Sequence, residues 1–226
     1  MTFALILLGT VAACFALRNP IKRWPLAFYV LAVAVDVLFI AGMFGGLPRP
    51  VWSVLFVLVQ KCTLSLALFV VVMYIGVLSR DSKPCLWLKP IRAELSIIAW
   101  ILSLGHMAVY LESYLPRIVA GGPFNLNVMS SFVVAIILFA LLIVLGVTSF
   151  NVVKKRMHTE TWKKVQKLSY PFFLLVYVHL LLMLLPAALR GGIASGVSVG
   201  VYSVIFVGYM VLRLMRAAKD KRADAA

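Results

Sequence analysis

The sequence predicts an all-α fold, a polytopic transmembrane helical bundle of six or seven spans. Hydrophobic residues make up 64% of the 226 positions and charged residues only 13%, which is far from the balance of a soluble domain. Apolar runs close to the roughly 20 residues that cross a bilayer recur along the whole chain. We therefore expect one integral-membrane domain over residues 1–226, with a basic cytoplasmic tail at residues 213–226.

Seven apolar segments follow one another, separated by basic stretches or by turns rich in glycine and proline. They are Thr2–Leu17, Leu26–Gly46, Val51–Leu78, Ala93–Leu115, Val128–Phe150, Leu168–Leu189 and Val197–Leu212. The first is short, and its alternative interpretation is a cleaved signal peptide. No Lys or Arg precedes its apolar core, whereas a signal peptide carries its positive charge first. We therefore expect a retained first helix; its removal would leave six spans.

The distribution of basic residues predicts the orientation of the bundle. The stretches after segments one, three, five and seven carry 3, 4, 6 and 5 Lys or Arg residues, 18 in all, whereas the other loops carry only Arg49, Arg117 and Arg190. The positive-inside rule then places the basic stretches and the tail in the cytoplasm and, with seven spans, the N-terminus outside. This topology explains the net charge of +15, so the charge does not indicate nucleic-acid binding.

Ionisable residues well inside the apolar segments mark candidate functional sites, because an unpartnered polar group is costly there. They are Asp36, Lys61, His106, Glu112 and His179. Counting about 1.5 Å per residue places all of them except Glu112 about 15 Å from the outer boundary, near the middle of the bilayer. The segments of His106 and His179 run in the same direction, so the two imidazoles can face each other at one depth.

Two opposed imidazoles are a ligand set for a heme that transfers electrons, and helical bundles build such sites from facing helices. We therefore predict one heme b, with His106 and His179 as the axial ligands of its iron. Tyr110 lies four residues after His106 on the same helix face, where it would line the pocket or donate a hydrogen bond. Gly105 is expected to relieve crowding near the ring. Neither histidine has a second ligand three or four residues on, which argues against zinc or di-iron.

The sequence is compatible with three roles for Asp36 and Lys61. They can form a buried ion pair that satisfies itself, because an unpaired charge at this depth is costly. They can instead belong to a proton path, or contact a cofactor carboxylate, the role for which Lys61 is the candidate. The three cysteines are widely spaced and predict neither a disulfide framework nor a metal site.

Several motifs resemble those of the ferric-reductase-like transmembrane domain family. They are Arg92–Ala99 with His106 and Tyr110, then Leu145–Ser149, Trp162–Tyr170 and His179. The likeness covers about residues 50–190. It is greatest to the heme-binding membrane subunits of methionine sulfoxide reductase systems.

The resemblance implies a b-type heme protein that passes electrons across the membrane, with a heme-binding core at residues 50–190 and His106 and His179 as axial ligands. The family often has a further histidine thirteen residues before the second one; this chain has Gln166 there, which implies one heme and not a stacked pair. From Arg92 to His106 is about 21 Å of helix. Electrons would therefore come from a flavin (FMN or FAD) that reaches between the helices, or from a membrane quinol.

We accordingly expect a multi-pass protein of the bacterial plasma (inner) membrane. A cytoplasmic flavin reductase would dock on the basic stretch at residues 154–167, which equally suits anionic lipid. A periplasmic oxidoreductase or a metal ion would accept the electrons at the outer face.

Two other classes of function stay open. One is an ion-coupled transporter using Asp36 and Lys61, although no inverted repeat or paired broken helices are visible. The other is a cofactor-free membrane scaffold subunit, in which either histidine is replaceable.

Overall fold

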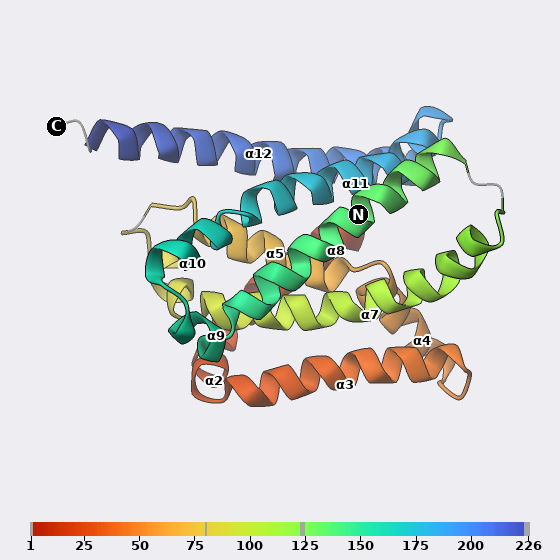
Figure 1. Ribbon diagram of the computed structural model, residues 1–226, viewed down its shortest axis with the longest axis horizontal. Helices are drawn as coiled ribbons and strands as arrows, with labels where there is room; N and C mark the ends of the chain where they lie inside the picture. Colours follow the sequence, from red (N-terminus) through yellow and green to blue (C-terminus); the bar gives the residue numbers. More distant parts are fainter. Residues whose placement is uncertain (1, 80, 123–124, 224–226) are drawn as a thin grey trace.

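The computed structural model describes residues 2–79, 81–122 and 125–223, and over these residues the chain is helical with no strand (Figure 1). Five helices are long and apolar enough to cross a membrane, and one bent helix pair is a sixth candidate. The five are α3 (Pro25–Met43), α7 (Arg92–Val119), α8 (Leu126–Ser149), α11 (Ser169–Leu189) and α12 (Ile193–Ala223). The predicted all-α polytopic bundle is confirmed.

The first predicted segment forms α1 (Thr2–Ala16), which packs against the bundle with one face and leaves Leu5 and Leu8 exposed on another. Its 15 residues extend about 22 Å, less than the roughly 30 Å of a bilayer core. Phe3 and Cys14 are buried in the core. At the C-terminal end of α1, the indole N–H of Trp87 donates to the Phe15 carbonyl at 3.2 Å. The described chain therefore has five candidate spans, or six with the bent pair, and α1 is a shorter apolar helix beside them.

The third predicted segment, Val51–Leu78, is a candidate span, but its helix is broken in the middle. α4 (Arg49–Leu55) passes into a π-helical turn (Phe56–Gln60), and after a two-residue break the chain continues as α5 (Thr63–Ile75), bent by 42°. Cys62, inside the break, is the one described non-glycine residue with a positive φ, 53°. Irregular backbone at membrane depth is tolerated where it is buried in protein or lines a cavity. The break is a single one, without a counterpart elsewhere among the described helices.

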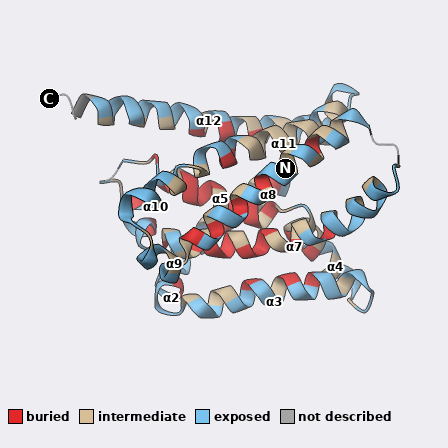
Figure 2. Ribbon diagram, viewed as in Figure 1, coloured by how far each residue is buried: buried red, intermediate tan, exposed pale blue. Residues whose placement is uncertain are grey.

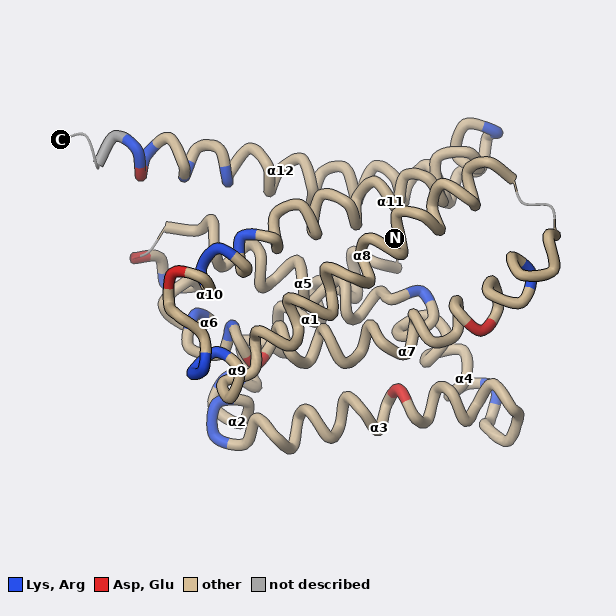
Figure 3. Tube along the Cα trace, viewed as in Figure 1, with Lys and Arg blue, Asp and Glu red and all other residues tan. Residues whose placement is uncertain are grey.

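Short helices form the end of the bundle where basic residues gather, in stretches that read as loops in the sequence. They are α2 (Arg18–Arg23), α6 (Lys83–Leu88), a 3-10 turn (Lys89–Ile91), α9 (Asn151–Arg156) and α10 (Thr159–Gln166). α12 also continues past Leu212, where the predicted span ends, into the basic tail. Figure 3 shows most Lys and Arg residues at this end, which we call the basic end.

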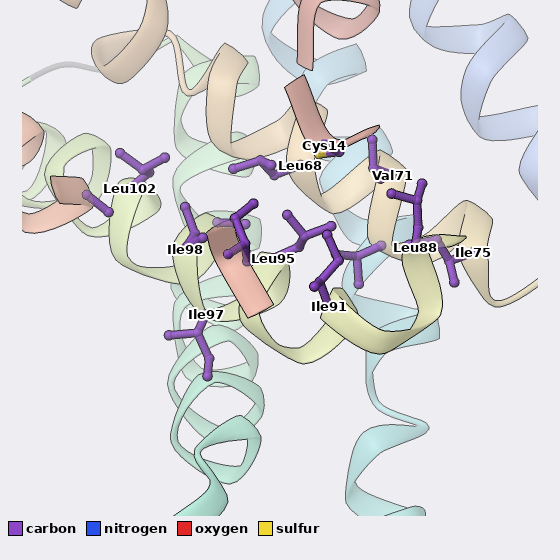
Figure 4. Close-up of a cluster of buried hydrophobic side chains, with 14 of the residues drawn as sticks. Cys14, Leu68, Val71, Ile75, Leu88, Ile91, Leu95, Ile97, Ile98 and Leu102 are labelled. Atoms are coloured by element: carbon purple, nitrogen blue, oxygen red, sulfur yellow. The ribbon is translucent and has the colours of Figure 1, made fainter. Parts of the chain in front are cut away.

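The core lies around α5 and α7 (Figure 2), and ten of the 13 residues of α5 are buried. Leu68 of α5 and Leu95 and Ile98 of α7 belong to one apolar cluster (Figure 4). The Ser65 hydroxyl donates to the Ala99 carbonyl at 2.6 Å and ties the two helices together within the cluster. Burial of this apolar surface fixes α7, and His106 follows two turns further along it.

The hairpin of α11 and α12 carries the second histidine. The two helices are joined by a turn in which Gly191 has a φ of 86°. Their interface is aromatic: the Phe173 and Phe206 rings lie 4.4 Å apart, and Tyr177 stacks on Phe206 at 5.1 Å. Aromatic pairs of this kind stabilise a packed interface beyond simple burial. They hold the turn of α11 that precedes His179.

Candidate functional site

A cavity lies between the two helices that carry the histidines. Its volume is about 690 Å³, within the roughly 300–1,000 Å³ usual for cofactor pockets. α7 contributes His106 and Tyr110 to its wall, α11 contributes His179, and the break before α5 contributes Lys61. Residues of α1, α8 and α12 complete it. The structure thus brings the four sequence-predicted site residues to one cavity.

The His106 ring is held by the backbone at the helix break. Its Nδ1 lies 2.6 Å from the Gln60 carbonyl oxygen. A carbonyl can only accept, so Nδ1 carries the proton and donates. Nε2 is then the nitrogen with the free lone pair, which is the form of histidine that binds a metal.

The Gln60 carbonyl is available because the helix breaks directly after it. The left-handed conformation of Cys62 interrupts the helix. The Thr63 hydroxyl donates to the Val57 carbonyl at 2.7 Å and so satisfies another group freed by the break. In an unbroken helix, the N–H four residues later would occupy the Gln60 carbonyl. Here His106 occupies it, so the broken span orients the histidine of the next helix.

The His179 ring is held by α8. Its Nδ1 lies 3.2 Å from the Ser131 carbonyl oxygen and 2.9 Å from the Ser131 hydroxyl. The carbonyl contact again requires a protonated Nδ1, which leaves the lone pair on Nε2. Ser131 is only 2% exposed, so this bond is shielded from water.

The donor set fits a heme and does not fit a zinc or di-iron centre. Two neutral histidines, each with Nδ1 occupied, face one cavity, and the described residues contain no group of three or more His, Cys, Asp or Glu side chains that could hold a metal ion. A porphyrin brings its own four nitrogen ligands and needs two from the protein at most. The remaining wall is largely apolar, with Phe132, Phe139 and Met183 among its residues.

A row of aromatic rings in successive contact extends from His106 along α7. The Tyr110 ring lies 4.7 Å from the His106 ring, and Tyr114 stacks on Tyr110 at 5.9 Å. Phe132 of α8 lies 6.0 Å beyond Tyr114. Tyr110 thus lies on the cavity wall beside His106, where its four-residue spacing predicts it.

Asp36 and Lys61 do not form the ion pair that the sequence allowed. Asp36 is buried on α3 and is absent from the cavity wall, whereas Lys61 is exposed and its ammonium lies 5.5 Å from the centre of the Phe56 ring. Among the described residues, no salt bridge joins them. Lys61 therefore remains the candidate for contact with a cofactor, and Asp36 does not.

The expectation that Gly105 relieves crowding near the ring is wrong. A Cβ at Gly105 would lie 2.6 Å from the Asp36 carboxylate and 3.0 Å from Val59. Successive helical residues point about 100° apart, so Gly105 faces α3 when His106 faces the cavity. This glycine makes room for a buried carboxylate of the neighbouring helix.

Gln166, at the position where the resemblance implied a further histidine, and Arg92, at the start of α7, are engaged in other contacts. The Gln166 amide donates to the Thr148 hydroxyl at 3.0 Å, and the Trp162 indole donates to the Thr148 carbonyl at 3.0 Å. These bonds fasten α10 to the end of α8. The Arg92 guanidinium donates from Nε to the Val72 carbonyl at 3.1 Å.

Ser131 and the Gln60 carbonyl are the site groups that the sequence analysis missed. Two signals were present. Gln60 begins a run of four polar or polarisable residues, 60–63, in the middle of an apolar span. Ser131 follows Ser130 in another apolar span. Polar residues inside a span indicate irregular backbone or a buried hydrogen bond.

The fold and the cavity define a class: a multi-pass helical membrane protein in which two histidines face one internal cavity. The chain belongs to the ferric-reductase-like transmembrane family, because the family model described as "Ferric reductase like transmembrane component" matches residues 61–177, just over half of the chain. The match begins at Lys61, includes His106 and Ser131, and ends two residues before His179. Membership points to a role in membrane electron transfer.

A relative in Treponema pallidum (strain Nichols), described as an uncharacterized protein, is 36% identical over 214 residues. The alignment covers 93% of this chain and 59% of the relative, so this chain spans about three fifths of the relative's length. No solved structure matches this chain.

Proposed function

We propose that this protein is a b-type heme electron-transfer subunit of a bacterial inner membrane, with one heme between His106 and His179. The observation that carries the proposal is the matched state of the two rings. Each donates from Nδ1 to a main-chain carbonyl, which leaves Nε2 as the ligating nitrogen, and both rings line one cavity. The family's link to membrane electron transfer supports it.

The chain's own residues hold and insulate the cofactor. A heme bound by two imidazoles exchanges single electrons without opening a coordination position. Gln60 and Ser131 fix the orientation of the two rings and raise their basicity as ligands. Lys61 is the one Lys or Arg on the described cavity wall, and it supplies a cation for a cofactor carboxylate. The apolar side chains around them keep water away from the iron.

We assign the electron donor to the basic end and the acceptor to the opposite end. The exposed lysines of α9 and α10, including Lys155 and Lys164, form a surface that suits an acidic flavin reductase. A membrane quinol is the alternative donor. The acceptor is a periplasmic oxidoreductase, such as the catalytic subunit of a methionine sulfoxide reductase system, or a metal ion.

Reduced-minus-oxidised optical spectra of the purified protein test the proposal. We expect a b-type band and about one heme per chain in the wild type. His106→Ala and His179→Ala should each lose most of that heme, because one imidazole remains where two are needed. Size-exclusion elution on the same samples reports whether each variant is still folded.

His158→Ala is the matched control, because His158 is exposed between α9 and α10, outside the cavity. It should keep the wild-type spectrum and heme content. A wild type without a b-type band, or folded His106→Ala and His179→Ala variants with unchanged spectra, would contradict the assignment.

A further inference from the structure

A second cavity, of about 250 Å³, lies at the basic end and is separate from the histidine site. Its wall is formed where α5 ends, by α6 and the 3-10 turn that follows it, where α7 and α11 begin, and by the C-terminal half of α12. Its lining residues include Tyr170, Arg213, Lys89 and Arg92. These positions are the places where apolar spans meet basic stretches, which is the depth of lipid headgroups.

The charge of this cavity is strongly unbalanced. Its described lining contains four basic side chains and a single carboxylate, that of Asp220. The basic residues are Lys89, Arg92, Arg213 and Arg216. Four cations around a small half-buried space repel one another, and a bound anion would relieve that repulsion.

Two of the four cations have a structural role that explains part of their placement. Arg92 donates from Nε to the Val72 carbonyl at 3.1 Å, and Arg216 donates to the Leu78 carbonyl at 3.4 Å. Arg216 also pairs with Asp220 at 3.1 Å. The two arginines thereby satisfy carbonyls at and just beyond the C-terminal end of α5, where positive charge is favourable.

The other two cations are not explained in this way. The Arg213 guanidinium lies 4.7 Å from the centre of the Tyr170 ring. Among the described residues, neither Arg213 nor Lys89 makes a side-chain hydrogen bond or ion pair. Gly76 keeps the space beside Arg92 open, since a Cβ there would lie 3.2 Å from the Arg92 Nη2. The cavity therefore has two side chains, Arg213 and Lys89, whose N–H groups can donate to a ligand, and it has room for that ligand.

We propose that this cavity binds the phosphate group of an anionic phospholipid from the leaflet at the basic end. Guanidinium and ammonium groups are the side chains that recognise phosphate. Basic pockets between transmembrane helices at this depth bind anionic headgroups. Leu212 and Leu214, on either side of Arg213, are exposed and offer an apolar surface for the acyl chains. Inorganic phosphate has the same binding chemistry, so the test separates it from the lipid.

Native mass spectrometry of the heme-loaded or heme-free protein in neutral detergent measures the binding. Dioleoylphosphatidylglycerol, dioleoylphosphatidylcholine and inorganic phosphate are titrated in separate arms. We expect one phosphatidylglycerol to bind more tightly than phosphatidylcholine. Lys89→Gln combined with Arg213→Gln should weaken that binding about 25-fold, at about fivefold for each basic side chain removed. Both substitutions leave intact the hydrogen bonds from Arg92 and Arg216 to the carbonyls at the end of α5.

The control removes the same charge from the same end of the molecule. Lys155→Gln combined with Lys164→Gln changes two exposed lysines that do not line the cavity, and should leave the tight phosphatidylglycerol site unchanged. Equal loss in both double variants, or no preference for phosphatidylglycerol in the wild type, would overturn the proposal. Millimolar inorganic phosphate that displaces bound phosphatidylglycerol entirely would overturn the lipid assignment. Loss of heme in the histidine variants does not bear on any of these outcomes.

Discussion

At the scale of single residues, the two histidines are oriented by unequal sets of partners. His106 donates to a main-chain carbonyl, which no side-chain substitution removes. His179 contacts both the carbonyl and the hydroxyl of Ser131. The hydroxyl is therefore the one part of this support that a conservative substitution can delete. Deleting this hydroxyl measures directly how much a hydrogen bond to a ligand histidine contributes to cofactor retention.

Ser131→Ala should speed the loss of heme while leaving the fold intact. The His179 ring keeps its carbonyl partner but loses a hydrogen bond that restrains it, and groups behind a metal-bound histidine typically contribute 10- to 100-fold. Because the carbonyl remains, we expect about a tenfold faster transfer of heme to excess apomyoglobin. Absorbance at the heme band follows the transfer.

Ser130→Ala is the control for this experiment. Ser130 is the preceding residue on α8 and does not line the cavity. It should transfer heme at the wild-type rate. Equal rates in the two serine variants would mean that the Ser131 hydroxyl does not restrain the ligand.

Depth counting predicted which residues approach one another in the bundle but not which way they point. Asp36, Lys61, His106 and His179 could be placed at one level because the rise of a helix is constant. Three of them line the cavity, and Asp36 does not. The role of Gly105 was predicted wrongly, because the neighbour of each helix face depends on packing that the sequence does not state. The Gln60 carbonyl could not be found by residue type at all, since every residue has one.

At the scale of elements, the broken third span is the largest departure from the prediction. Hydropathy reports how apolar a stretch is, and the stretch on either side of the break is apolar. It does not report the conformation of Cys62 or the π-helical turn before it. π-helical turns inside helices occur frequently at functional sites, and this one supplies the acceptor for a candidate ligand histidine. The irregular backbone is thus linked to the cavity.

The contact between α7 and α8 depends on the small size of Gly146. The Trp100 indole lies directly against this glycine, where any Cβ would collide with the ring. Trp100 also packs edge-on against Phe150 at 5.7 Å. The glycine therefore sets the separation of the helix that carries His106 from the helix that carries Ser131.

Gly146→Ala should destabilise the bundle by about 1–3 kcal/mol, the usual cost of overpacking a filled core. Apparent melting in detergent, followed by circular dichroism, should occur several degrees below that of the wild type. Gly200→Ala is the matched change, because a Cβ on Gly200 of α12 meets open space. Its melting temperature should be unchanged or slightly raised. Equal melting temperatures of the two variants would show that the α7–α8 contact accommodates a Cβ at Gly146 without loss of stability.

At the scale of the whole molecule, the fold class followed from composition and the repetition of apolar segments. These signals are strong because a bilayer admits only spanning helices or closed barrels. The count of spans was less certain for a physical reason. α1 is apolar but short, and it packs with Phe3 in the core, so apolarity alone does not say how far it crosses. The short helices at the basic end were missed because their amphipathic or mixed sequences resemble loops.

The orientation of the molecule in the membrane can be tested by the accessibility of two single cysteines. The excess of Lys and Arg at one end predicts that this end faces the cytoplasm. Lys155 lies exposed on α9 at the basic end, and Arg190 lies exposed in the turn between α11 and α12 at the opposite end.

In cells with an intact inner membrane, a membrane-impermeant maleimide should label Arg190→Cys and not Lys155→Cys. After permeabilisation it should label both. The natural cysteines give little background, since Cys14 and Cys85 are buried, and the unsubstituted protein measures what remains from Cys62. Labelling of Lys155→Cys before permeabilisation would invert the topology, and with it the sides assigned to the electron donor, the acceptor and the anionic lipid.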